Sequence, residues 1–445
     1  MAKPKALIIS YHFPPDFHVG ARRAARIAKY LPRLGWEVWV LTLPVEASGD
    51  TSHVPLPEER IVRIAPRRSS AGAVDEAAAM LGDALPQDSR RGMIVRLKGW
   101  ASRSIGMRMD ELLWVGPALE AAKQLVKEHQ IDVIFSSCSP FPCHMIANKL
   151  KRSLRIPWVA DFRDPWANNP WAPGNAAWQR GLRKLLEHRV VRNADYITFV
   201  TKPMRDHFMK EAQSFDPARV LVFSHGFDPE DFADVQPLPE TDHKKMIISH
   251  TGTLGGYRPP AGFFDALAQT LEQGLIPRDQ LELRLIGMDD DTGKEGSIGQ
   301  LLAARKLQDV VKVLGVVPHH VALAHQLSSD LLLYLQTRAD GGEIFASAKI
   351  YEYLGANRPV LAVAGESAGV TILRNAQVAT IVPPDNPAAI AAALRSHFCA
   401  WQAGKTIFQP CREVVASFEE PAPIKALAEI LNKAIGEADE TRNCC

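Results

Sequence analysis

Residues 5–43 read KALIISYHFPPDFHVGARRAARIAKYLPRLGWEVWVLTL. The apolar runs at 5–10 and 36–43 predict two strands, and the amphipathic stretch between them predicts a helix that ends near Gly35. A strand, a helix and a strand in this order form a βαβ unit. Because the same order recurs along the chain, we expect an α/β protein with parallel sheets that helices cover on both faces.

The alternation of helix and strand runs in two series along the 445 residues, which are too many for one ordinary core. We expect two doubly wound, Rossmann-like domains, at 1–215 and 216–418. A stretch at about 66–108 interrupts the first domain. The final helix, at 419–440, follows the second sheet and is expected to pack back on the first domain.

The composition, 46% hydrophobic and 23% charged, is that of an ordinary soluble protein. No run of 18 apolar residues is present to span a bilayer, and the N-terminal apolar stretch is too short for a signal peptide. We therefore expect a cytoplasmic protein. The six cysteines have no metal-ligand spacing, which predicts reduced thiols without a metal role.

Positive charge is concentrated in the first half of the chain. Residues 1–210 contain 32 Lys and Arg against 20 Asp and Glu, a net charge of +12, and the remainder carries −10. A basic half predicts an anionic partner, such as a membrane surface, a phosphate-bearing substrate or nucleic acid. The alternative is that the two halves attract each other. The segment SRRGMIVRLKGWASRSIGMRM at 89–109 is typical either of a basic membrane-surface segment or of an insertion loop.

Ligands of open parallel sheets bind where the strands end, so the loops there are the first candidate sites. Gly20 precedes a helix whose first turn carries Arg22, and free backbone N–H groups with that guanidinium could bind an anion. The later loop TGTLGGYR contains Gly252, which allows a phosphate to approach closely, and Arg258, which could neutralise it. No GxGxxG follows the first strand, which argues against a dinucleotide-dependent dehydrogenase.

Residues 343–355, EIFASAKIYEYLG, place two charges in an apolar helical run. Ser347 and Lys349 fall near the helix start, where backbone amides and the Lys349 charge could hold a diphosphate. Glu352, one turn on, could accept hydrogen bonds from ribose hydroxyls. The alternative is an ion pair between Lys349 and Glu352 on a solvated helix face, worth a few tenths of a kcal/mol.

Four stretches together carry a family resemblance, which covers nearly the whole chain, from residue 6 to about 431. They are YHFPPDFHVGARRAARIAKYLPRLGWEVWVLT, IPWVADFRDPW, HTGTLGGYR and ASAKIYEYLGANRPVLAVA. In this order they resemble a retaining glycosyltransferase of family 4, which has the GT-B fold. The resemblance implies that the C-terminal domain binds a nucleoside-diphosphate sugar and that the N-terminal domain receives the acceptor.

The resemblance also implies roles for single residues. Arg258 and Lys349 would stabilise the diphosphate, and Glu352 would hold the ribose. The implied donor-binding set is Gly252, Thr253, Ser347, Lys349 and Glu352. Family members commonly carry a second Glu eight residues before the ribose Glu, where this chain has Ile344. We expect the neighbouring Glu343 to take that catalytic role beside the donor sugar.

Several residues of the first domain are candidates for acceptor contact. In the stretch ADFRDPW, Asp161 and Arg163 lie at a predicted strand end, either for acceptor contact or as a structural Arg–Asp pair that closes a loop. His144 lies early on a predicted helix and is either a helix-start residue or a catalytic one. Gly20 and Arg22 complete this expected acceptor site.

The function expected from these features is metal-independent sugar transfer of the hexosyltransferase type. The donor is a co-substrate, so no cofactor is expected, and the acceptor is a saccharide or a lipid-linked intermediate of polysaccharide or lipopolysaccharide synthesis. The three carboxylates at 289–291 are typical of a solvated loop more than of a metal site. We expect no nucleic-acid partner. The alternatives are a sugar-nucleotide epimerase of the same architecture and a non-catalytic scaffold that binds the nucleotide sugar.

Overall fold

The computed structural model divides the chain into two compact units, Met1–Ser224 with Pro423–Cys445, and His225–Ala422. The residues that the structure describes are 2–16, 18–45, 54–68, 108–167, 169, 177–212, 215–238, 244–254, 261–287, 297–336 and 342–443. Most of the expected insertion at 66–108 lies outside them. Within these ranges no helix has the length and apolarity to cross a bilayer.

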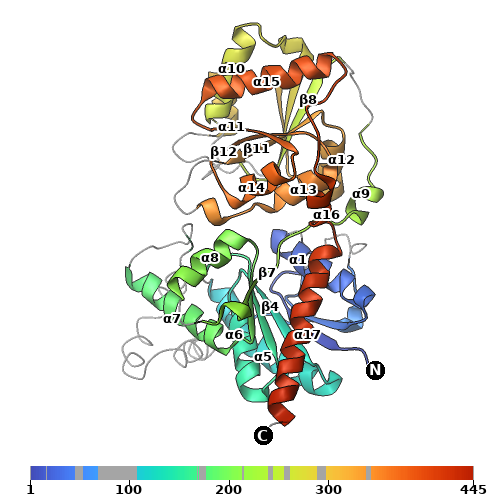
Figure 1. The fold of residues 1–445 in the computed structure, drawn as a ribbon, viewed down its shortest axis with the longest axis vertical. Coiled ribbons are helices and arrows are strands. Elements are labelled where there is room, and N and C mark those ends of the chain that lie inside the picture. Colours follow the sequence, from blue (N-terminus) through green and yellow to red (C-terminus); the bar gives the residue numbers. More distant parts are fainter. Residues whose placement is uncertain are drawn as a thin grey trace. The chain divides into compact units, whose positions relative to one another are not determined.

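The first unit is built on a seven-stranded parallel sheet of order β3-β2-β1-β4-β5-β6-β7 (Figure 1). Its strands are β1 Lys5–Ile9, β2 Glu37–Thr42, β3 Ile61–Arg63, β4 Val133–Cys138, β5 Trp158–Phe162, β6 Tyr196–Phe199 and β7 Val220–Val222. The strand order reverses between β1 and β4, so the loops after these two strands diverge and leave room for a ligand. The doubly wound α/β fold predicted for this part is confirmed.

Helices cover this sheet as the periodicity predicts. They are α1 Val19–Tyr30, η1 Pro32–Leu34, η3 Glu58–Arg60, α5 Met109–His129, α6 Pro142–Leu154, α7 Ala177–Asn193, α8 Lys202–Glu211 and η4 Pro217–Arg219, with α17 Ala422–Asn443 from the end of the chain. The predicted stop near Gly35 is confirmed. Gly35 adopts φ +89°, a left-handed conformation that glycine takes without strain.

Helix α17 belongs to the core of the first unit. Its Ile424, Leu427 and Leu431 are buried in the same cluster as Ala24 and Ile27 of α1, and Figure 1 shows α17 running beside α1. The boundary between the units falls after Ser224 and not at 215, because β7 pairs with β6 and so extends the first sheet.

The second unit contains a six-stranded parallel sheet of order β10-β9-β8-β11-β12-β13. Its strands are β8 Met246–Thr251, β9 Leu281–Ile286, β10 Val311–Gly315, β11 Leu331–Gln336, β12 Val360–Ala364 and β13 Ala379–Val382. Its helices are α9 Glu230–Ala233, α10 Ala261–Glu272, η5 Arg278–Gln280, α11 Ile298–Ala304, α12 His319–Leu327, η7 Gly342–Ile344, α13 Ala348–Ala356, α14 Ala368–Asn375, α15 Pro387–Gln402 and α16 Arg412–Ala416. The order reverses between β8 and β11, which makes the loop after β8 a candidate ligand site.

Candidate functional site

Lys349 is buried at the start of α13. Its side chain is 8% exposed, and its Nζ lies 3.1 Å from Nε2 of His250, a wholly buried residue near the end of β8. The Lys349 side chain therefore extends from the start of α13 to the carboxyl end of β8. The interpretation of this helix face as solvated is wrong, because Lys349 lies in the protein interior.

The tautomer of His250 decides which atom donates the hydrogen bond between His250 and Lys349. Its Nδ1 lies 2.9 Å from the carbonyl oxygen of Leu333, so Nδ1 must carry the proton that it donates. The lone pair of Nε2 is then free to accept from Lys349 Nζ, and the imidazole is neutral. His250 was not predicted from the sequence. The signal for it was a single polar ring at the end of the apolar run MIIS.

Two glycines bring backbone against this pair. A Cβ on Gly252, which has φ +104°, would lie 3.0 Å from Cε and Nζ of Lys349. A Cβ on Gly287, with φ +138°, would lie 2.4 Å from the carbonyl oxygen of Gly252. The ends of β8 and β9 thus pack backbone to backbone, and the half-buried Thr253 follows directly. This is an arrangement in which a phosphate could approach both amides and an ammonium. Arg258 lies outside the described residues.

Glu352 is held by two side chains of α12. Its Oε1 lies 3.2 Å from His319 Nε2, and its Oε2 lies 3.4 Å from Gln326 Nε2. The same Gln326 Nε2 also donates to Thr251 Oγ1 at 3.1 Å, which ties the carboxylate to the end of β8. An oxygen of an ionised carboxylate can accept two hydrogen bonds, so Glu352 can also accept one from a ligand hydroxyl. Its ribose role stays a prediction.

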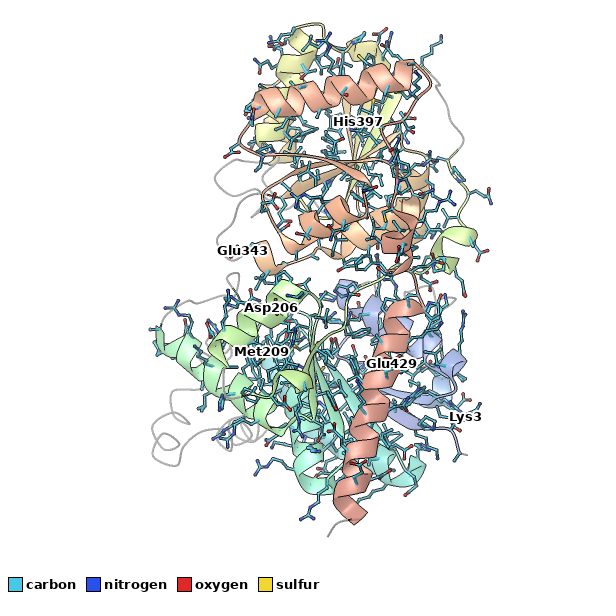
Figure 2. All side chains as sticks on the ribbon, viewed as in Figure 1. Lys3, Asp206, Met209, Glu343, His397 and Glu429 are labelled. Atoms are coloured by element: carbon cyan, nitrogen blue, oxygen red, sulfur yellow. The ribbon has the colours of Figure 1, made fainter. Side chains whose placement is uncertain are left out.

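The turn before α13 buries Ile344 and exposes Glu343. Glu343 is labelled in Figure 2. The register that packs Ile344 into the interior therefore directs Glu343 to solvent. Ser347 takes an extended conformation as the N-cap of α13, directly ahead of Lys349. The catalytic role expected for Glu343 stays a prediction.

In the first unit, Asp161 is structural. It is wholly buried and accepts four hydrogen bonds, from Arg23 Nε at 2.9 Å, Arg23 Nη2 at 2.8 Å, and the hydroxyls of Ser137 and Thr198 at 2.8 Å each. A carboxylate with every oxygen so engaged has no face left for an acceptor. The expected acceptor contact is wrong at Asp161, and its ionic partner is Arg23, not Arg163.

His144 is likewise part of the core. It is wholly buried, its Nδ1 lies 2.8 Å from Ser136 Oγ, and that hydroxyl accepts from Trp158 Nε1 at 2.7 Å. Among the described residues its Nε2 has no hydrogen-bond partner. Burial lowers the pKa of His144 to about 3, so the ring is neutral. The catalytic alternative for His144 is wrong because no ligand can reach the ring.

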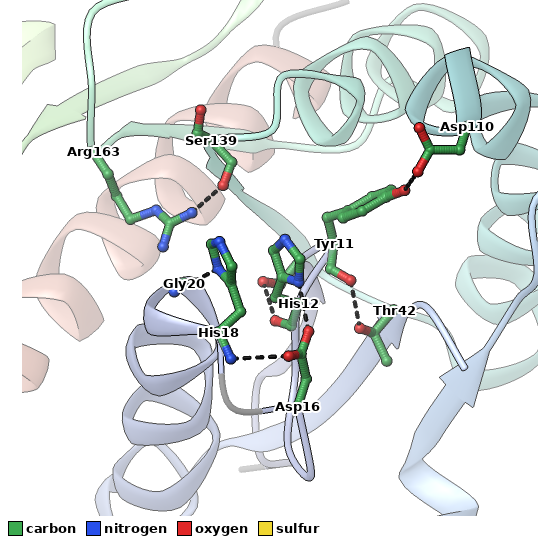
Figure 3. A network of polar contacts seen from close by, with 10 residues as sticks. Tyr11, His12, Asp16, His18, Gly20, Thr42, Asp110, Ser139 and Arg163 are labelled. Carbon is green, nitrogen blue, oxygen red and sulfur yellow. Dashed lines mark hydrogen bonds and ion pairs between the residues drawn. The ribbon is translucent and has the colours of Figure 1, made fainter. Parts of the chain in front are cut away.

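A polar network follows β1 (Figure 3). His12 Nδ1 lies 2.5 Å from Asp16 Oδ2, and the backbone N–H of His18 donates to Asp16 Oδ1 at 2.9 Å. The rings of His12 and His18 stack with centroids 3.8 Å apart. His18 Nδ1 accepts from the backbone N–H of Gly20 at 3.0 Å and so caps α1. Partial burial and then His12 lower the pKa of His18, which agrees with an unprotonated Nδ1.

Arg163 meets this network at Gly20. Its Nε donates to the carbonyl of Cys138 at 3.0 Å and its Nη2 to that of Ser139, and a Cβ on Gly20 would lie 2.8 Å from its Nη1. A side chain at position 20 would therefore displace the Arg163 guanidinium, and the structure brings these two expected acceptor residues together. Arg22 follows on α1 and is half-buried. His12, Asp16 and His18 were not predicted from the sequence, and their signal was three polar residues at short spacing in one loop.

Acidic groups from α5 lie beside the same loop. Tyr11 Oη lies 3.5 Å from Asp110 Oδ2, and Glu111 accepts from the backbone N–H of Arg108 at 3.0 Å. Burial raises the pKa of Glu111 to about 7. The carboxyl edge of this sheet therefore carries basic and acidic side chains around the loop after β1.

Comparisons with known proteins agree with this architecture. Residues 20–226 match the family model of the glycosyl transferase 4-like domain. No curated protein matches the chain. Sucrose-phosphate synthase from Thermosynechococcus elongatus superposes with a TM-score of 0.66 at 16% identity, over 98% of this chain and 100% of that one.

Two further structures extend the comparison. Anabaena Alr3699/HepE, in complex with UDP and glucose, superposes with a TM-score of 0.63 at 15% identity, over 97% of this chain and 100% of that one. The lipopolysaccharide outer core galactosyltransferase WaaB gives a TM-score of 0.53 at 13% identity, over 97% and 99%. At these identities the likeness establishes the fold. The chain therefore has the GT-B fold, and its first unit matches a glycosyl transferase 4-like domain.

Proposed function

We propose that this GT-B protein transfers a sugar from a nucleoside-diphosphate sugar to an acceptor, with retention of configuration. One observation carries the proposal: the buried ammonium of Lys349 is held by His250 against the backbone of Gly252, where the second sheet changes strand order. A fixed positive charge at the start of α13, beside a glycine loop, suits a diphosphate. The family-model match supports glycosyl transfer as the reaction.

The proposed chemistry is electrostatic. The bond between the anomeric carbon and the diphosphate oxygen breaks, and negative charge grows on that oxygen. Lys349 and the amides at the start of α13 stabilise the charge without reorganising, because His250 already holds the ammonium in place. The acceptor hydroxyl gives its proton to the departing diphosphate oxygen, and its oxygen forms the new glycosidic bond to the anomeric carbon. Arg258 and Glu343 are proposed to assist at the diphosphate and at the donor sugar.

The proposed donor site consists of the loop after β8 and the first turns of α13. Gly252, Thr253 and Ser347 supply backbone and hydroxyl groups, and Glu352 accepts from the ribose hydroxyls. UDP is the first nucleotide to try, because Alr3699/HepE of the same fold was solved with it. No cofactor or metal is required in this scheme, since Lys349 supplies positive charge.

We place the acceptor in the first unit, at the loop after β1. Arg163, which lies against Gly20, offers a cation there. The pair of His12 and Asp16 offers an imidazole ring and a carboxylate that can form hydrogen bonds. The charge of +12 on residues 1–210 favours an anionic acceptor, such as a lipid-linked or lipopolysaccharide intermediate. The fold shared with WaaB is consistent with that class. The proposed location is the cytoplasm, at the inner face of the cytoplasmic membrane.

A panel of nucleotide sugars tests the proposal. The donor should raise the melting temperature, because a ligand at 100 times its Kd adds about 2.7 kcal/mol of stability. Both binding and transfer should survive EDTA. Loss of transfer that Mg²⁺ or Mn²⁺ restores would instead assign a metal role, with the carboxylates at 289–291, outside the described residues, as the first candidates.

Product analysis separates the alternatives. A transferase consumes donor in proportion to acceptor, and NMR of the product reports the anomeric configuration. An epimerase would convert the donor sugar with no acceptor present. A scaffold would bind the nucleotide sugar and never convert it.

A further inference from the structure

Helix α7 presents a stripe of basic side chains to solvent, three of which are Lys or Arg. Arg180, Lys184, His188 and Arg192 recur every four residues, which places them on one side of the helix. All four are exposed. Trp178, at the beginning of the same helix, is 46% exposed, although an indole ring is normally buried. We call these five residues the α7 face.

The acidic residue of α7 points away from this face. Glu187 is the one Asp or Glu among residues 177–193, and its Oε2 accepts the backbone N–H groups of Trp166 at 3.0 Å and Ala167 at 2.9 Å. Leu186 and Val190 are buried on the same inner side. The helix therefore uses its negative charge to hold the loop after β5, and its outer side is left positive.

One contact moderates this charge. Lys184 Nζ lies 2.9 Å from Glu211 Oε2 at the end of α8, with both side chains largely exposed. Exposed pairs of this kind are weak and are screened by salt, so a stronger anionic partner can displace Glu211. Arg180 and Arg192 have more than ten residues between them, which spans about 18 Å along the helix axis.

We propose that the α7 face docks on an anionic lipid bilayer. Trp178 would enter the interface, where indole rings are favoured, and the basic side chains would lie along the phosphate headgroups. An exposed tryptophan at the edge of a basic stripe fits the headgroup region of a bilayer, where indole rings are favoured. Bases of single-stranded RNA could also stack on this ring, so RNA binding is measured as the rival outcome. Figure 1 shows α7 at the periphery of its unit, outside α6. The inference deepens the proposed function by bringing a lipid-linked acceptor to the protein.

The test is co-sedimentation of the full chain with phosphatidylcholine vesicles that contain an increasing share of phosphatidylglycerol. Binding should rise with that share and fall with salt. The triple variant Arg180→Gln, Lys184→Gln, Arg192→Gln should bind about a hundredfold less well, since each charge near the surface contributes about fivefold. Trp178→Ala should lower the binding that remains at high salt, where the charges are screened.

A charge-matched control is available elsewhere in the unit. Lys3, Lys127 and Arg152 are exposed and lie outside α7 (Lys3 is labelled in Figure 2), and their joint replacement by Gln should leave vesicle binding nearly unchanged. Equal losses in both triple variants, or no loss in the α7 variant, would overturn the proposal. So would a loss confined to Gln substitutions of Arg90, Arg91, Arg96 and Lys98, which would assign lipid binding to that segment.

Two further readouts separate the proposal from its rivals. Weaker binding of a single-stranded RNA by the α7 variant, with vesicle binding intact, would make the face a nucleic-acid surface and overturn the proposal. UDP affinity is measured on every variant and should stay at the wild-type value, which shows an intact second unit. A wild-type protein that binds vesicles through α7 but binds no nucleotide would refute the proposed function while the lipid proposal stood.

Discussion

The ammonium of Lys349 lies 3.1 Å from Nε2 of the wholly buried His250. Because Nδ1 of this imidazole donates to the carbonyl of Leu333, Nε2 can only accept, and it draws Lys349 to one position at the end of β8. The protein thus places a positive charge before any ligand arrives. Such preorganisation lets an electrostatic group act on a transition state without the cost of rearranging.

Replacing Lys349 should weaken nucleotide binding. A charge-assisted hydrogen bond contributes about 1.5–3 kcal/mol, so Lys349→Ala should lower UDP affinity by roughly 10- to 150-fold in calorimetry. Lys312→Ala is the control, since Lys312 is exposed on β10 of the same unit and bonds Glu282. Equal affinities for wild type and Lys349→Ala would remove the ammonium from the nucleotide site.

His250 should act as a positioning residue, and two substitutions separate its two hydrogen bonds. Gln at 250 can extend an acceptor toward Lys349, whereas Asn retains only a donor near Leu333. We expect His250→Asn to lower UDP affinity by about tenfold and kcat by more, and His250→Gln to stay within about threefold of wild type. If both variants lose the same UDP affinity and have equal urea midpoints of unfolding, His250 contributes only to the packing of the core and does not position Lys349.

Glu352 should discriminate between ribose and deoxyribose. If its carboxylate accepts from the ribose hydroxyls, wild type should prefer UDP over 2′-deoxy-UDP by about tenfold, and Glu352→Gln should erase most of that preference. Competition binding measures both ligands on one protein sample. Glu343→Gln, at an exposed position, should keep the full preference. A preference that survives in Glu352→Gln would assign the ribose contact to another residue.

Acid should destabilise the first unit through His144. Its folded pKa of about 3 lies below the ordinary value of 6.5, so the unfolded chain binds the proton and stability falls as pH drops from 6.5 towards 3. The loss is about 1.4 kcal/mol per pH unit, or about 2 kcal/mol at pH 5. In His144→Leu the urea midpoint should depend less on pH between 7.5 and about 5, while His207→Gln, at an exposed position of α8, should behave as wild type. An unchanged pH dependence in His144→Leu would contradict the assignment.

The order of helices and strands could be predicted because it follows from local periodicity. The strand at 5–9, the helix before Gly35 and the strand at 37–42 each depend on residues within a few positions. Lys349 could also be selected, since a lysine at a helix start has a local signal. Its partner could not be, because His250 lies 99 residues earlier and meets Lys349 only when the sheet has formed.

The residues expected to contact the acceptor show where such reasoning fails. Asp161 and Arg163 are close in sequence, but Asp161 is the fourth residue of β5 and faces the interior, whereas Arg163 lies beyond the strand end. The ionic partner of Asp161 is Arg23, 138 residues away. His144 fails for the same reason, since its place in α6 directs the ring towards Trp158 and Phe162. For Asp161 and His144, the side of the strand or helix that faces the core decided the outcome.

The membership of α17 in the first unit makes the second unit an insertion. The chain leaves the first unit after Ser224 and returns to it at Pro423. A fragment that stops at 224 would lack Leu427 and Leu431 and would expose the apolar surface that they cover. Replacing the second unit by that of another protein therefore requires two splice points, one after Ser224 and one before Pro423, so that the last helix stays with the first unit.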